Sequence, residues 1–476
     1  MTGVEPRRVP LVVLGGGPGG YPCAFAAADA GLDVVVVDDA DAPGGTCLRN
    51  GCIPSKALLH ISRVITEAAD AREAGVTFSD PIVDLDRLRD WKNEVVAGLA
   101  GGVSQLASAR KIEWISAKGK LLDEHTLSLT TKSGDQSLLE FDRLVVATGA
   151  RPAWPEQFPR DTNRLMDSTA ALELPFVPAR LLVVGGGYIG LELGTVFSSL
   201  GSKVTVVEMS GSLLAGADRD LVRPLQRRLE NHFDAIRLQT SVETLAVDGD
   251  AVNAVLRDEA GDSELTTFDG VLVAVGRRPN SQDVGLAEAG VAVDEMGHVV
   301  TDESGQTTRQ HIYSVGDVCS GPMLAHRATA DAKRVVASLM EQATPVGKPP
   351  VIPAVVFTDP EVAWCGLTET EAKNSGVAVE VVRVPWVAAG RAHSMGRTDG
   401  LTKLVVDPVS RVVLGAGIVG VGAGELIGEA VVAVNSKLTT ADLGDAIHAH
   451  PTLSETVSEA ADHFERQAIH LLPRRR

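Results

Sequence analysis

The sequence predicts an α/β fold in which one unit occurs twice and a smaller α+β unit follows. Residues 11–20 (LVVLGGGPGG) and 181–190 (LLVVGGGYIG) each join an apolar, β-branched run to a glycine motif. A small-residue helical pattern and a second apolar run follow each motif, in the order strand, helix, strand. From about residue 351 the chain instead alternates apolar strands with helical segments. These observations indicate two parallel-sheet units and a separate third unit.

Composition argues against several classes of protein. Hydrophobic residues make up 44% of the 476 residues and charged residues 22%, which is typical of a globular chain. Five cysteines are too few for a secreted disulfide scaffold or a set of zinc sites. The net charge of −18 argues against nucleic acid as a partner. Because no apolar run is long enough to span a bilayer, we expect no membrane association and a cytoplasmic location.

Each glycine motif has the sequence context of a dinucleotide-binding site. G-x-G-x-x-G follows a strand and opens a helix, and an acidic residue, Asp38 or Glu208, ends the next strand about 20 residues later. The first glycine allows a tight turn, the second lets backbone amides approach a pyrophosphate, and the third permits close packing of helix and strand. In chain order these glycines are Gly15, Gly17 and Gly20, then Gly185, Gly187 and Gly190. Two such sites predict two bound dinucleotides.

Two further observations assign the sites. After Glu208 the sequence MSGSL contains no Arg or Lys to bind a 2′-phosphate, so we expect the second site to prefer NAD over NADP. The first motif shares its half of the chain with a cysteine pair, which favours a flavin there. HIYSVGDV (311–318) predicts a buried strand that delivers Asp317 to a second part of the bound cofactor.

Proline-rich segments indicate where the domains divide. RPAWPEQFP (151–159) is typical of a linker, and GKPPVIP (347–353) of a boundary before the last domain. We expect four domains, of which the third completes the first cofactor site: 1–150, 151–277, 278–350 and 351–476.

The segment GGTCLRNGCIPSK (44–56) allows three interpretations of Cys47 and Cys52. A zinc site needs about four ligands, and the other three cysteines are scattered. A structural disulfide across so short a loop would stabilise a large cytosolic protein little. A redox pair accounts for more, because Pro54 suits the first turn of a helix and places Cys52 at its N-terminus, where a thiolate is favoured. Lys56 lies on the same helix face and adds positive charge.

Thiol exchange also needs a base, and HAHPTLSE (448–455) offers one. Pro451 is expected to fix a turn and start a helix, so that Glu455 folds back to orient the imidazole of His450. His448 is expected to be structural. Without the cysteines, the same pair would be interpreted as a capped helix beside a solvated histidine.

The motifs together resemble those of the flavoprotein disulfide reductases, the class I pyridine nucleotide-disulfide oxidoreductases, and among them the dihydrolipoamide dehydrogenases (E3 components). The motifs that carry the resemblance run through nearly the whole chain in order: GGTCLRNGCIPSKALLH, GGGYIGLELG, VAVGRRPN, YSVGDV, PMLAHRA, FTDPEVAWCGLTE and HAHPTLSE. The resemblance implies two Rossmann-like dinucleotide-binding domains, for FAD and for NAD, plus a C-terminal α+β dimerisation domain. It also implies a homodimer in which His450 and Glu455 reach the cysteines of the other subunit.

The resemblance further implies roles for individual residues. Lys56 pairs with Glu192 beside the flavin, Tyr188 is a gate between flavin and nicotinamide, and Asp317 holds the ribityl chain. The residues expected to contact FAD are Gly15, Gly17, Gly20, Asp38, Gly45, Thr46, Lys56, Thr148, Gly149, Asp317 and Ala325. Those expected to contact NAD are Gly185, Gly187, Tyr188, Gly190, Glu208 and Gly276. No metal is expected.

The implied reaction oxidises dihydrolipoamide at Cys47, with Cys52 facing FAD and a hydride passing to NAD⁺. The implied partner is the lipoyl-bearing acyltransferase (E2) of a 2-oxoacid dehydrogenase complex or the lipoyl protein of glycine cleavage, and the implied wider role is in cell redox homeostasis. The alternative is another FAD-dependent reductase acting on a low-molecular-weight disulfide. Glutathione-type relatives use NADPH, mercuric reductases carry a C-terminal cysteine pair, and the related transhydrogenases lack the first cysteine. A non-catalytic scaffold would be expected to have lost part of this machinery.

One position departs from the family pattern. C-L-N-x-G-C is usual, whereas Arg49 follows Leu48 here. We expect an added cation near the cysteines to shift their reduction potential modestly.

Overall fold

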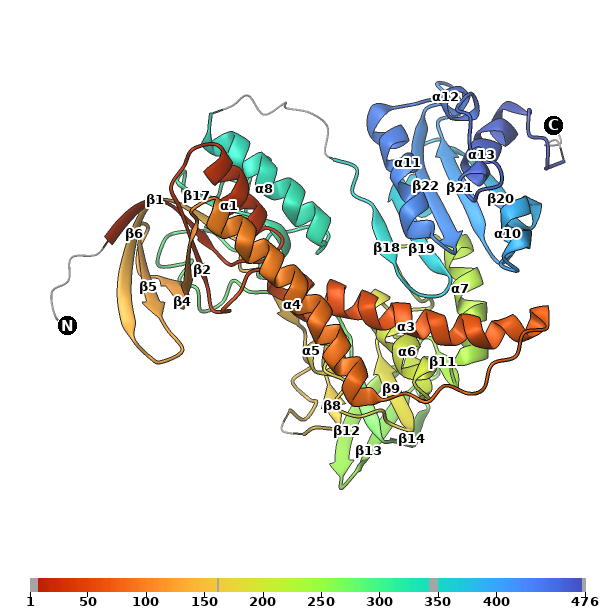
Figure 1. Ribbon diagram of the computed structural model, residues 1–476, viewed down its shortest axis with the longest axis horizontal. Coiled ribbons are helices and arrows are strands. Elements are labelled where there is room, and N and C mark those ends of the chain that lie inside the picture. Colours follow the sequence, from red (N-terminus) through yellow and green to blue (C-terminus); the bar gives the residue numbers. More distant parts are fainter. Residues whose placement is uncertain (1–6, 161, 342–349, 473–476) are drawn as a thin grey trace.

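The computed structural model describes residues 7–160, 162–341 and 350–472. Its strands form three main sheets, which Figure 1 shows at the left, at the lower centre and at the upper right. The predicted α/β class is confirmed. No helix within the described ranges is long and apolar enough to cross a membrane.

The first sheet has the order β3-β2-β1-β6-β5-β4, and β17 pairs with β6. Its parallel strands are β1 (Arg7–Leu14), β2 (Val34–Asp38), β3 (Glu113–Ser116), β6 (Gln136–Val146) and β17 (Ile312–Ser314). The antiparallel strands are β4 (Lys118–Leu121) and β5 (Thr126–Thr130). The central strands are buried on both faces, because helices cover a parallel sheet on both sides. The helices of this part are α1 (Gly20–Asp29), α2 (Gly45–Asn50), α3 (Cys52–Asp70), α4 (Leu85–Ala109) and α8 (Ala325–Leu339).

Residues 278–341 do not form a main sheet of their own. They supply β17 to the first sheet and α8 to the helices of that part. Val284, Val299 and Ile312 lie in its hydrophobic core. The four-domain division remains a prediction.

The second sheet repeats the first unit. Its parallel strands, in spatial order, are β11 (Ala235–Arg237), β10 (Lys203–Val207), β9 (Arg180–Val184), β15 (Gly270–Val273) and β8 (Leu165–Met166). The helices here are α5 (Ser168–Leu172), α6 (Tyr188–Ser199) and α7 (Arg219–His232). A small antiparallel sheet of β12 (Ser241–Asp248), β13 (Ala251–Arg257) and β14 (Ser263–Phe268) flanks it. A ribbon of β7 (Ala150–Pro152) and β16 (Arg277–Pro279) links it to the first sheet.

The third sheet is antiparallel, which confirms the predicted α+β unit. Its strands, in spatial order, are β18 (Ala354–Val356), β19 (Glu361–Gly366), β22 (Val413–Gly420), β21 (Leu401–Val406) and β20 (Glu380–Pro385). The helices of this part are α9 (Glu369–Ser375), α10 (Gly390–Ser394), α11 (Ala423–Ser436), α12 (Thr440–Gly444) and α13 (Glu455–Glu465).

A buried ionic cluster joins the second and third parts. Lys403 on β21 is 1% exposed, and its Nζ lies 2.8 to 3.0 Å from carboxylate oxygens of Asp218, Asp220 and Glu369. Burial alone would raise the pKa of Asp218. Hydrogen bonds from Lys403, Thr370 and the Glu369 amide have the larger, opposite effect and lower this pKa to about 2. The cluster therefore depends on the ammonium group at its centre.

Replacing Lys403 with Met should destabilise the protein by about 3 kcal/mol, because the buried Asp218 carboxylate loses its cation. Asp220 and Glu369 are more exposed and keep their ion pairs with Arg383. The folded-state pKa of Asp218 is depressed, so its stabilising contribution is complete above about pH 4 and is lost as pH falls toward 2. Thermal unfolding should show a lower midpoint temperature for the variant than for the wild type at pH 7. The difference between the two midpoints should become smaller as the pH is lowered to 3. Lys120→Met, at a surface pair with Glu288, is the matched control. Equal midpoints for Lys403→Met and wild type at pH 7 would contradict this.

Candidate active site

A cavity of about 390 Å³ lies where the first glycine motif, the cysteine segment and the start of α6 meet. Of the residues expected at the site, it is lined by Gly15, Gly17, Asp38, Gly45, Thr46, Cys47, Cys52, Lys56, Thr148, Gly149, Tyr188, Glu192, Asp317 and Ala325. Those that do not line it are Gly20, Gly185, Gly187, Gly190, Glu208, Gly276, His450 and Glu455. The fold thus gathers nearly all of the expected FAD contacts in one place, from segments 300 residues apart.

The first glycine motif forms a tight backbone turn without side chains at its glycines, at the N-terminus of α1. Gly15 has φ +107°, and a Cβ on Gly20 would lie 1.8 Å from the Gly15 carbonyl oxygen. A Cβ on Gly45 would lie 2.5 Å from the Gly17 Cα, so only glycine allows the two loops to touch. The second motif repeats this, since a Cβ on Gly190 would lie 2.1 Å from the Gly185 oxygen. Both turns fit a pyrophosphate at a helix N-terminus.

The two strand-ending acids also hold these turns together, a role that sequence reasoning missed. Asp38 accepts hydrogen bonds from the backbone N–H groups of Gly16 and of Ala40. Glu208 accepts from the N–H of Gly186 at 2.7 Å and of Ser210 at 2.8 Å. Burial raises the pKa of Asp38, and these N–H donors oppose the rise. Each carboxylate retains lone pairs that could accept from a ribose hydroxyl.

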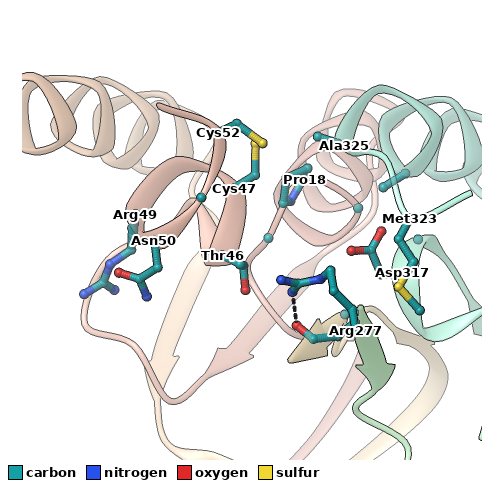
Figure 2. Close-up of a pocket in the computed structure, with 18 of the residues that line it drawn as sticks. Pro18, Thr46, Cys47, Arg49, Asn50, Cys52, Arg277, Asp317, Met323 and Ala325 are labelled. Atoms are coloured by element: carbon teal, nitrogen blue, oxygen red, sulfur yellow. Dashed lines mark hydrogen bonds between the residues drawn. The ribbon is translucent and has the colours of Figure 1, made fainter. Parts of the chain in front are cut away.

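Cys47 lies within α2, and Cys52 lies at the start of α3. Gly51 separates the helices, so Cys52 is the first residue of α3, as predicted from Pro54. Both are free thiols, and Figure 2 shows their sulfur atoms side by side. The hydrogen bond from Cys47 lowers the pKa of Cys52 to about 7 against burial, with help from the charge of Lys56. The pKa of Cys47 is raised by the same hydrogen bond and by burial, so Cys52 is the thiolate of the pair.

Lys56 and Glu192 form the expected ion pair, with 2.8 Å between Nζ and Oε2. The other oxygen of Glu192 accepts from the backbone N–H of Phe357 at 2.9 Å. The ring of Phe357 also lies 4.5 Å from the Lys56 ammonium, which is a cation–π contact. Phe357 was missed as a site residue, although it stands in the FTDPE motif.

Asp317 lies in a short 3₁₀ turn after β17 and faces the cavity (Figure 2). Burial raises its pKa, and the positive charges of Arg277 and Arg327 oppose the rise. Arg277, also missed by sequence reasoning, donates to the backbone oxygen of Ala150. Tyr188, at the first turn of α6, lines the same cavity and is 39% exposed.

His450 and Glu455 form the expected pair, with 2.8 Å between Nδ1 and Oε1. The second oxygen of Glu455 accepts from the N–H of Thr452 at 2.7 Å. The helix begins at Glu455, so the expectation that Pro451 starts it is wrong by four residues. One chain does not bring this pair to the cysteines: the His450 side chain is 77% exposed and is absent from the cavity lining. In Figure 1, α13 lies at the upper right, away from the start of α3.

Arg49 stands at the position that departs from the family pattern. Figure 2 shows its side chain directed away from the two sulfur atoms, and its Nη1 donates to the Ala42 oxygen at 3.2 Å. Its charge lowers the pKa of Asp38 and of Asp41. Arg49 lines the same cavity as the cysteines but points away from their sulfur atoms, and the expected shift in their reduction potential stays a prediction.

Comparisons with known proteins identify the family of the chain. Residues 9–332 match the family model "Pyridine nucleotide-disulphide oxidoreductase", and residues 352–461 match its dimerisation domain. The dihydrolipoyl dehydrogenase of Vibrio cholerae is 41% identical over 96% of either chain.

Two solved structures have the same fold. LpdA from Mycobacterium tuberculosis gives a TM-score of 0.88 at 25% identity, over 96% of this chain and 99% of that one. The HOCl-induced flavoprotein disulfide reductase RclA from Escherichia coli, as its Cu(II) complex, gives 0.85 at 28% identity over the same shares. The family resemblance found in the sequence motifs is confirmed: the chain belongs to the pyridine nucleotide-disulphide oxidoreductases.

Proposed function

We propose that this protein is a dihydrolipoamide dehydrogenase that uses FAD and NAD⁺. The observation that carries the proposal is the Cys47–Cys52 dithiol at the N-terminus of α3, in one cavity with a dinucleotide-binding turn and the Lys56–Glu192 pair. The name carried by the Vibrio cholerae relative, which is similar over nearly its full length, supports the choice of substrate.

The residues present fit both cofactors. The glycine turn at α1, Asp38 and Asp317 would hold the pyrophosphate, ribose and ribityl parts of FAD, and the cavity has room between them. The turn at α6 and Glu208 would hold NAD, with Ser210 where a 2′-phosphate would need a cation. When bound, FAD would supply two-electron transfer between the dithiol of Cys47 and Cys52 and an NAD⁺ held at the α6 turn.

The chain's own residues account for the thiol steps. A substrate thiolate attacks Cys47 of the oxidised pair, which breaks the Cys47–Cys52 bond and releases Cys52 as the thiolate favoured at that position. The second substrate thiol then displaces Cys47 and closes the lipoamide disulfide, so two electrons and two protons leave the substrate. His450 takes up a proton at Nε2 while Glu455 holds its Nδ1–H. Because His450 is exposed and remote from its own cysteines, we assign this role to His450 of the partner subunit in a homodimer.

The proposed partner is a lipoyl-bearing acyltransferase or the lipoyl protein of glycine cleavage, met in the cytoplasm. The net charge of −18 is compatible with docking onto a basic subunit-binding domain.

A second candidate is reduction of a low-molecular-weight disulfide. The similarity to RclA, a HOCl-induced flavoprotein disulfide reductase, supports it. In such an enzyme the same two cysteines would pass electrons to the substrate disulfide and would not take them from a substrate dithiol.

NAD⁺ reduction by dihydrolipoamide tests the proposal, with NADP⁺ as competing acceptor and glutathione as competing thiol. Fast turnover only with NAD⁺ and dihydrolipoamide is expected. Little turnover by a flavin-loaded protein with intact cysteines would show that dihydrolipoamide is not the substrate and would favour the second candidate.

The titration of Cys52 should respond in opposite directions to its two charged neighbours. The charge of Lys56 lowers the pKa of Cys52 and that of Glu192 raises it, around a value of about 7. Lys56→Met should therefore move the thiolate midpoint of the reduced protein to higher pH, and Glu192→Gln should move it to lower pH. Thiolate absorbance against pH, in flavin-free protein, measures both. Shifts of the same sign would contradict the electrostatic account, and Lys120→Met serves as the surface control.

A further inference from the structure

The loop segment 445–450 between α12 and α13 carries His450, and its one side chain that is not exposed is that of His448. The His448 side chain is 10% exposed, and its Nε2 lies 2.8 Å from Oε1 of Glu429 on α11. Its Nδ1 lies 2.9 Å from the backbone oxygen of Ala446. His448 thus fixes the loop two residues before the base.

Both partners of the His448 ring are hydrogen-bond acceptors. A carbonyl oxygen has no proton to give, and neither has an ionised carboxylate. A neutral imidazole has one N–H and would leave a ring lone pair facing an oxygen, whereas the imidazolium donates to both. Two neighbouring carboxylates favour the same positive charge: Glu429 on α11 and Asp462 on α13.

His450 has the opposite arrangement two residues later. Its Nδ1 meets Glu455, and no hydrogen bond to its Nε2 occurs among the described residues. With 77% of the side chain exposed, the neutral ring keeps an accessible lone pair on Nε2. Two histidines of one short motif, each with its own glutamate, are therefore set up for different protonation states.

We propose that His448 is a positioning residue that stays an imidazolium, and that its ion pair with Glu429 sets the loop that presents His450 to the partner's cysteines. The kinetic part of this inference rests on the proposed function, and the protonation part does not. A catalytic group displaced by about 1 Å loses on the order of a hundredfold in rate, which is why anchoring two residues away matters.

Rapid mixing of the holoenzyme tests the positioning role in His448→Asn, Glu429→Gln, Glu429→Asp and the Asn/Gln double variant. Reduction by dihydrolipoamide should slow roughly tenfold to a hundredfold in His448→Asn and Glu429→Gln. Glu429→Asp, which keeps the charge, should lose less. The double variant should be no slower than the worse single one, because the two residues act as a unit.

Reduction of the same variants by NADH should stay at the wild-type rate, because that step does not use the loop, and it shows that each variant folds and holds flavin. His298→Asn, at a histidine–carboxylate pair with Asp294 elsewhere, is the matched control. Normal dihydrolipoamide rates in both single variants, or additive losses in the double variant, would overturn the positioning role.

Nitrogen-15 spectra of the histidine side chains test the protonation state without any substrate. At neutral pH His448 should show two protonated ring nitrogens and His450 one, and Glu429→Gln should leave His448 with one. A neutral His448 in the wild type would overturn the proposal. If wild-type protein does not oxidise dihydrolipoamide, the proposed function fails. In that case the rate at which dithiothreitol, another dithiol, reduces the same cysteines is compared between wild type and the loop variants.

Discussion

The buried carboxylate of Glu192 is the constraint on which the arrangement of the site depends. It is 3% exposed and accepts from Lys56 on α3 and from the Phe357 backbone before β19. An unpaired carboxylate in such a place would cost several kcal/mol, so these partners must stay together. The cysteine helix, the second glycine helix and the C-terminal unit are thereby fixed to one point. These contacts of Glu192 therefore also fix the distance between the thiols and the second nucleotide site.

Sequence reasoning predicted the features that short motifs determine. The glycine turns, the start of α3 at Cys52 and the Lys56–Glu192 pair were expected, because glycine spacing, proline and family motifs encode them locally. It could not place Arg277, which reaches the site through β16, far along the chain. The direction of Arg49 was also missed, because it depends on how the short helix α2 is rotated against the glycine turn.

If the proposed function is right, a single chain carries only part of the site. The cavity holds the thiols, the ion pair and the cofactor turns, while the base and its glutamate lie exposed on another unit. The loop that carries His450 has its own contacts through His448, which lies within hydrogen-bond distance of Glu429 and of the Ala446 oxygen. The proposed function accounts for the exposure of the His450–Glu455 pair if a second chain covers it, and the match of residues 352–461 to the family's dimerisation domain supports such a dimer.

Hybrid dimers test this two-chain site most directly. One chain carries Cys47→Ser and the other His450→Gln, and two affinity tags isolate the mixed species. If the base serves the partner's cysteines, each hybrid retains one complete site and about half of the wild-type dihydrolipoamide activity, while both parent homodimers are nearly inactive. Hybrids as inactive as their parents would show that base and thiols must share a chain, and would contradict the account.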